Sequence, residues 1–163
     1  MDAITIEAVG TPTDEVRALI AALDRTLAAE YLPEQQHGLT LDAIFQPHVL
    51  FFVARLEGVA VGCGGVAFFE GFGEVKRMYV RDDVRGRGIA QALLSRIESE
   101  AKERGLDMLR LETGERQLAA LKLYERAGFR PCDVFGDYAA MTPNAIATSV
   151  FMEKRLPTPR AGK

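Results

Sequence analysis

A chain of 163 residues has the size of one ordinary domain, and with 48% hydrophobic residues it can bury a core without disulfides or a structural metal. Its 20 basic and 23 acidic side chains give a formal net charge of −3, which excludes a broadly basic nucleic-acid-binding surface and an extended disordered chain. Cys63, Cys132 and two histidines are too few for a convincing zinc site, and we expect both cysteines to be reduced and buried.

The sequence shows no sign of export or membrane insertion. Residues 1–6 lack the basic start and the apolar run of a signal peptide, and no stretch approaches the roughly eighteen apolar residues of a membrane span. We therefore expect a cytoplasmic protein that binds neither membrane nor nucleic acid. It should form a single domain over residues 1–156, followed by a flexible tail at residues 157–163.

The first part of the chain predicts a strand and two helices. Alternation over residues 4–9 is typical of a strand, and Thr11 then offers an N-cap with Pro12 at the first helical position. This helix should end at residues 31–33, because a residue before proline avoids the helical region. A short second helix is expected over residues 41–45. The first helix has an apolar stripe at spacings of three and four: Val16, Leu19, Ile20, Leu23 and Leu27.

Three consecutive strands should follow. Residues 49–54 are too continuously apolar for an edge strand with one wet face, so this strand should be interior. Residues 57–58 mark a tight turn into a strand over residues 59–69, and the third strand is expected over residues 73–81. The middle strand contains three glycines that indicate a bulge or a close backbone approach: Gly62, Gly64 and Gly65.

The second half of the chain predicts two helices and three strands. An apolar residue at every fourth position supports a helix over residues 87–104, and a short strand follows at residues 108–112. A helix over residues 118–127 and strands near residues 129–135 and 148–154 complete the order. This mixture of hairpins and helical crossovers predicts an α/β fold with helices on both faces of a mixed sheet.

The turn over residues 85–90, Arg-Gly-Arg-Gly-Ile-Ala, lies between a strand and a helix. A helix N-terminus attracts anions, and Gly86 and Gly88 would let the backbone approach a diphosphate. Arg85 and Arg87 can add charge-assisted hydrogen bonds. We therefore expect the turn to bind the pyrophosphate of a nucleotide-bearing cofactor. The alternative is an ordinary turn with solvated arginines.

Other phosphate-binding motifs fit this turn less well. A dinucleotide fingerprint would place Gly or Ala where Gln91 stands, although Glu112 lies at about the distance of a ribose-binding acid, so this alternative stays open. The terminal Gly-Lys-Ser/Thr of a P-loop is missing.

Two motifs carry a family resemblance. Arg85-x-x-Gly88-x-Ala90, following residues 74–80, resembles the acetyl-CoA signature of the GNAT N-acetyltransferases. Residues 123–129, Leu-Tyr-Glu-Arg-Ala-Gly-Phe, are similar to a later motif of that family. The resemblance covers residues 49–131 directly and the remainder through topology. It implies a mostly antiparallel central sheet of about seven strands flanked by four helices.

The resemblance also implies an activity. The chain would be an N-acetyltransferase that uses acetyl-CoA and acetylates a primary amine by direct attack within a ternary complex. The acceptor could be a small-molecule amine, an amino acid or a peptide, and the sequence leaves open whether the chain forms a homodimer. A noncatalytic acetyl-CoA sensor and the use of another acyl-CoA are the alternatives.

The same resemblance assigns the cofactor contacts. The main chain near Met78 and Val80 should bind the pantetheine arm as an added strand, although their side chains are more typical of core packing. Gln117 stands where many members carry Asn, and its longer amide could still reach the cofactor. The expected cofactor-binding residues are Met78, Val80, Arg85, Gly86, Arg87, Gly88, Ile89, Ala90, Gln117 and Tyr124.

Two side chains are candidates for proton transfer. Glu74, a charge on an expected interior strand, could take the amine proton directly or through water. The alternative for Glu74 is a structural ion pair with Lys76 or Arg77. Tyr124 matches the GNAT tyrosine that protonates the departing thiolate, and its alternative is a core tyrosine.

Acceptor specificity should come from segments with weak patterning, because loops on a fixed scaffold carry recognition. These segments are residues 31–38 and 136–147.

Overall fold

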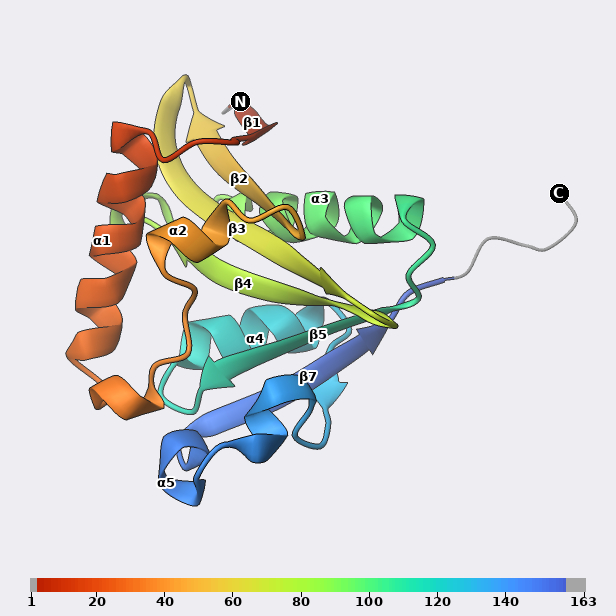
Figure 1. The fold of residues 1–163 in the computed structure, drawn as a ribbon. Helices are drawn as coiled ribbons and strands as arrows, with labels where there is room; N and C mark the ends of the chain where they lie inside the picture. Colours follow the sequence, from red (N-terminus) through yellow and green to blue (C-terminus); the bar gives the residue numbers. More distant parts are fainter. Residues whose placement is uncertain (1–2, 158–163) are drawn as a thin grey trace, which may run out of the picture.

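Seven strands form one sheet in the order β1-β2-β3-β4-β5-β7-β6, with helices on both faces (Figure 1). This computed structural model describes residues 3–157. All neighbouring strands are antiparallel except β4 and β5, so the predicted α/β fold with a mixed, mostly antiparallel sheet is confirmed. The strands are β1 (Ile4–Ala8), β2 (Val49–Leu56), β3 (Val59–Phe69), β4 (Phe72–Val80), β5 (Met108–Gly114), β6 (Arg130–Pro131) and β7 (Ser149–Arg155).

The four expected helices are present, and the single turn α5 adds one that the sequence pattern does not predict. Within residues 3–157, no helix has both the length and the apolar character needed to cross a bilayer. The helices are α1 (Asp14–Ala28), α2 (Leu41–Ile44), α3 (Ile89–Glu103), α4 (Leu118–Arg126) and α5 (Pro143–Ile146). The 3-10 turns are η1 (Pro33–Gln35), η2 (Asp82–Val84) and η3 (Gly136–Ala140).

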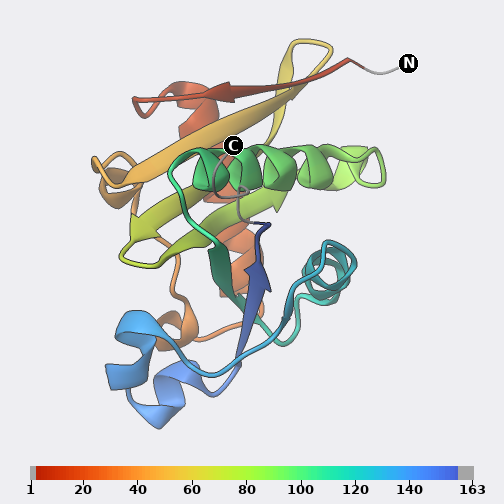
Figure 2. The ribbon, with the colours of Figure 1, turned by 90° about the vertical axis from the view of Figure 1, so that its right-hand side faces the viewer.

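The helices form one layer on each face of the sheet (Figures 1 and 2). Phe51 of β2 packs with Val16 of α1, whereas its neighbour Phe52 packs on the other side with Leu93 of α3. Side chains alternate along a strand, so a strand covered on both faces is apolar at every position. This explains why residues 49–54 of β2 are apolar on both faces, and the place of β2 between β1 and β3 confirms the predicted interior position.

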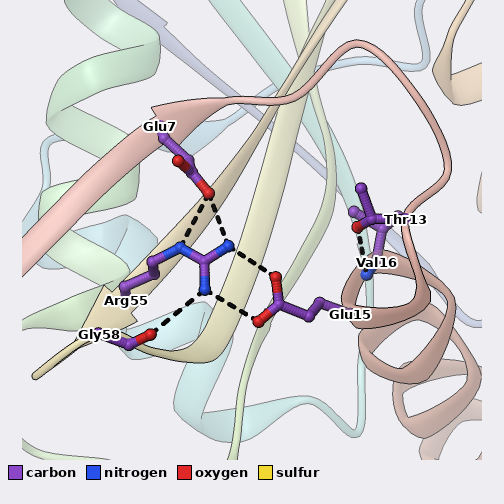
Figure 3. A network of polar contacts seen from close by, with 6 residues as sticks. All are labelled: Glu7, Thr13, Glu15, Val16, Arg55 and Gly58. Atoms are coloured by element: carbon purple, nitrogen blue, oxygen red, sulfur yellow. Dashed lines mark hydrogen bonds and ion pairs between the residues drawn. The ribbon is translucent and has the colours of Figure 1, made fainter.

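The start of α1 is fixed by a cap and an ion-pair network (Figure 3). The Thr13 hydroxyl accepts a hydrogen bond from the Val16 N–H at 3.2 Å, so Thr13 is the N-cap and the predicted cap at Thr11 is wrong. Arg55 of β2 binds Glu7 of β1 at 2.7 Å and Glu15 of α1 at 2.6 Å. The Arg55 hydrogen bond lowers the pKa of Glu15. One guanidinium therefore ties the first helix to the first two strands.

The register between β3 and β4 shifts at Gly64, one of the glycines expected to mark a bulge or a close backbone approach, and the extra residue lies in β4. Two residues of β4, Arg77 and Met78, lie opposite the single Gly64 of β3. Arg77 has φ +56°, in the left-handed region that non-glycine residues seldom adopt. A Cβ on Gly64 would lie 2.3 Å from Met78 Sδ, so a larger residue here would displace the Met78 side chain.

The parallel strands β4 and β5 are paired at one end only. Their register runs from Gly73 with Leu109 to Val75 with Leu111, and no pairing continues beyond it. The two strands then separate, as Figure 1 shows. The later residues of β4 and β5 therefore border a gap in the sheet.

The chain after α4 differs most from expectation. The strand predicted over residues 129–135 is reduced to β6, because Pro131 has no N–H for the ladder and the chain leaves the sheet after Cys132. Phe135 instead packs against Tyr138 and Phe151 in a separate cluster. Cys63 is buried as predicted, but Cys132 is only half-buried. Residues 158–163 of the predicted tail lie outside the described residues.

Thr13→Ala should lower the free energy of unfolding by about 1 kcal/mol, because the Val16 N–H loses its capping partner. Urea denaturation measures the change. Thr11→Ala is the matched control and should change stability by less than about 0.5 kcal/mol. Equal losses in both variants would contradict the assignment of the cap.

Candidate active site

Two adjoining cavities lie where β4 and β5 separate. The larger, about 700 Å³, is bordered by the end of β4, the turn before α3, and α4. The smaller, about 110 Å³, is bordered by β4, β5 and the loop after η1. Five residues line both cavities, which therefore meet: Leu23, Met78, Gln117, Ala120 and Tyr124.

The glycine turn presents an open helix N-terminus to the large cavity. Gly86 and Gly88 have φ +83° and +81°, which glycine adopts at little cost. No side chain caps α3, so its first-turn N–H groups remain available to an anion. A Cβ on Gly86 would meet nothing within 4 Å, and one on Gly88 would meet only Gln91 Oε1, at 3.7 Å. Space for a ligand therefore lies directly beside the backbone.

Most of the predicted cofactor-binding residues gather around the large cavity. Arg85 borders it while paired with Asp82 at 2.9 Å, whereas Arg87 is not among its lining residues. Gln117 lies at the N-cap position of α4 and borders both cavities. The predicted residues that line the large cavity are Met78, Val80, Arg85, Gly86, Gly88, Ile89, Ala90, Gln117 and Tyr124.

Tyr124 lies where the two cavities meet. It is 5% exposed, and its hydroxyl makes no hydrogen bond to any residue within 3–157. Burial raises its pKa, and the nearby Glu112 carboxylate raises it further. Tyr124 is therefore a protonated, unengaged donor at the junction.

Glu112 of β5 is a carboxylate in the wall of the small cavity. Burial raises its pKa, although the Ser149 hydroxyl opposes this by donating a hydrogen bond at 2.6 Å. Our sequence reasoning considered this residue only as a ribose-binding acid. A carboxylate on an interior strand was the signal that could have identified it, but its position at the strand separation depends on tertiary structure.

Glu74 forms the ion pair that the sequence offered as an alternative to a catalytic role. Its Oε2 lies 3.2 Å from Lys76 Nζ and accepts a hydrogen bond from the Tyr138 hydroxyl at 2.6 Å. The Glu74 side chain borders neither cavity. Any proton transfer from the acceptor to Glu74 would need an intermediary.

The segments expected to control specificity lie on the side of the small cavity. Tyr31 and residues 35–38 border it, whereas residues 136–147 do not. The two segments are joined, since His37 Nε2 lies 2.7 Å from the Ala145 carbonyl oxygen. Lys76 Nζ donates to the His37 carbonyl at 3.1 Å, which fixes the loop over β4.

Within residues 3–157, no cluster of three His, Cys, Asp or Glu side chains is arranged to hold a metal ion.

Comparisons with known proteins identify the family of this chain. The profile of the Acetyltransferase (GNAT) family matches residues 17–129. An "IAA acetyltransferase" of Azospirillum brasilense is 42% identical over 158 residues, covering 96% of this chain and 100% of that protein. A structure assigned as an acyl-CoA N-acyltransferase from Klebsiella pneumoniae has a TM-score of 0.73 and 40% identity, covering 94% of this chain and 98% of the other.

A more distant structure shares the fold. A GNAT family acetyltransferase from Elizabethkingia anophelis, solved with acetyl-CoA bound, has a TM-score of 0.65 and 22% identity, and the match covers 94% of this chain and 98% of that one.

The family match contains both motifs that carry the resemblance, the turn at residues 85–90 and residues 123–129. It makes this protein an acyltransferase with acetyl-CoA as its cosubstrate. The chain belongs to the GNAT family of acetyltransferases.

Proposed function

We propose that this protein transfers the acetyl group of acetyl-CoA directly to a primary amine while both substrates are bound. The observation that carries this proposal is the junction of the two cavities at Tyr124. Acetyl-CoA occupies the large cavity with its thioester at the junction, and the amine approaches from the small cavity. Holding both reactants in place lowers the entropic part of the barrier.

The turn before α3 binds the cofactor pyrophosphate. The open N–H groups of the first turn and the helix dipole stabilise its negative charge, and Arg85 adds a charge-assisted hydrogen bond. The main chain near Met78 and Val80 binds the pantetheine arm like an added strand. A backbone N–H there polarises the acetyl carbonyl, and this stabilises the oxyanion that forms during attack.

Proton transfer requires a base for the amine and an acid for the thiolate. An alkylamine with a pKa near 10.4 needs roughly 4 kcal/mol to lose its proton at pH 7. Glu112 borders the acceptor cavity, and its raised pKa makes it a stronger base than a solvent-exposed carboxylate. Tyr124 donates its phenolic proton to the sulfur as the C–S bond breaks. The base role predicted for Glu74 requires a water between it and the amine.

The cysteines support direct transfer over an acetyl-enzyme. Cys63 is fully buried, borders neither cavity, and burial raises its pKa to about 12. Cys132 also lies outside both linings. Since only a thiolate is an effective acyl acceptor, neither cysteine is suited to carry the acetyl group.

An acceptor screen that follows thiol release from acetyl-CoA tests this function. We expect steady-state kinetics of a ternary-complex mechanism with at least one primary amine. A ping-pong pattern with an isolable acetyl-enzyme would contradict direct transfer. Acetyl-CoA binding without turnover of any amine would favour a noncatalytic sensor.

Gly88→Ala should raise the Kd for acetyl-CoA by about tenfold or more, because its φ of +81° disfavours a Cβ and the first-turn N–H groups lose their aim at the pyrophosphate. Gly105→Ala is the matched control, since Gly105 has φ +76° at the opposite end of α3. Both variants should lose similar stability, about 1 kcal/mol. Isothermal titration with acetyl-CoA should separate them, and equal Kd values would argue against the turn as the pyrophosphate site.

Tyr124→Phe and Glu112→Gln should each lower kcat by about 10²-fold or more with little change in the Kd for acetyl-CoA. Glu112 acts in its ionised form, so wild-type kcat/KM should fall as the pH drops through its raised pKa. This acidic limb should disappear in Glu112→Gln and persist in Glu74→Gln. The reverse result would assign the base role to Glu74.

A further inference from the structure

Two neighbouring cations of β4, Lys76 and Arg77, border the small cavity. Their presence is unexpected beside a site that we propose for an amine, because cations repel the protonated form of the acceptor. The bulge in β4 brings both side chains to this cavity, since strict alternation would place successive residues on opposite faces. The two cations differ in how fully the protein neutralises them.

Lys76 is satisfied by the protein itself. Its ammonium group has three donors, and it contacts three acceptors: Glu74 Oε2 at 3.2 Å, the Tyr138 hydroxyl at 3.0 Å and the His37 carbonyl at 3.1 Å. A ligand could recruit Lys76 only by displacing one of them. Lys76 therefore has a structural role in holding the loops beside the cavity.

Arg77 is not satisfied. Its side chain is only 5% exposed, and within residues 3–157 its guanidinium has one partner, Asp24, which contacts Nη2 and is itself 56% exposed. Nε is buried without a hydrogen bond, and Nη1 donates to no described residue. A buried guanidinium with unused donors is costly unless an anion joins it.

The backbone is shaped to place this guanidinium. Arg77 adopts φ +56°, a strained conformation that is retained at functional positions more often than elsewhere. Gly38, which also lines the cavity, leaves space for the guanidinium, because a Cβ there would lie 1.9 Å from Arg77 Nη1. Both features hold an incompletely paired cation at the edge of the acceptor site.

We propose that the acceptor is a small free amino acid whose carboxylate pairs with Arg77 while its amine faces Glu112. This inference rests on the proposed acetyltransferase function and specifies its substrate class. The carboxylate would complete the hydrogen bonding of the guanidinium, and the two charges of the zwitterion match the two charged walls of the cavity. A cavity of about 110 Å³ has room for a small molecule.

A peptide N-terminus fits these features less well. The carbon next to its amine carries a neutral amide in place of a carboxylate, so no second anion would join Asp24 at the Arg77 guanidinium. The loop at residues 35–38 also closes one side of the cavity and is fixed by His37 and Lys76. These contacts favour an acceptor that is enclosed over one that extends outward.

The test compares matched acceptors: free amino acids such as alanine, serine and methionine, the corresponding amino acid amides, and the amines that lack the carboxyl group. We expect kcat/KM for the best free acid to exceed that for its amide by at least about 30-fold. In Arg77→Met this ratio should fall close to one, with an unchanged Kd for acetyl-CoA. Arg77→Lys should restore part of the ratio, because it keeps the charge without the planar guanidinium.

Asp24→Asn is the matched control. It removes the ion-pair partner of Arg77 but keeps the guanidinium, so the preference for the free acid should persist. A purely structural Arg77–Asp24 pair would instead give similar stability losses in Arg77→Met and Asp24→Asn and no change in the acid-to-amide ratio. Should Arg77→Met not fold, the wild-type ratio together with that of Arg77→Lys decides the question.

The outcomes separate this inference from the proposed function. Turnover of amines, amides or peptides with no preference for a free carboxylate would overturn the amino acid acceptor and leave the acetyltransferase intact. Binding of acetyl-CoA without turnover of any acceptor would overturn both.

Discussion

The active site depends on the early end of pairing between β4 and β5. The two parallel strands share only three residue pairs, the last of which joins Val75 to Leu111. Backbone groups that a continued ladder would have paired are then available for a ligand, because backbone donors and acceptors away from water need partners. The cofactor main-chain contacts proposed near Met78 and the carboxylate of Glu112 lie on opposite sides of this gap. A continuous sheet would leave neither cavity.

The active site also depends on the bulge in β4. This bulge shows why the sequence could predict only part of the site. Glycines, arginines and an amphipathic helix identify the turn at residues 85–90 because the physics there is local. The tyrosine of α4 was identified by its motif. Arg77 could not be placed in this way, since one extra residue reverses the alternation from which its direction would be inferred.

The two carboxylates show a further limit of sequence patterns. Glu74 and Glu112 are both charges on interior strands, and nothing local separates a catalytic from a structural role. The difference comes from distant partners: the Tyr138 hydroxyl, 64 residues away, occupies Glu74. The strand pattern of the sequence was also weak after α4. There the path of the chain follows the packing of Phe135 on Phe151 and not local strand propensity.

The arrangement of charges follows from these contacts. Glu74, Tyr138 and the His37 carbonyl supply the three acceptors of Lys76, and they form a closed group with it. Burial raises the pKa of the Tyr138 phenol, and the Glu74 carboxylate raises it further, so the phenol stays protonated. Beside this closed group, Glu112 can still accept a proton, and Arg77 still has a hydrogen-bond donor without a partner. Buried polar groups with unused capacity are expected where a ligand supplies the missing partner. The structural charges of β4 therefore stabilise the loops, and the incompletely paired charges determine what the cavity can bind.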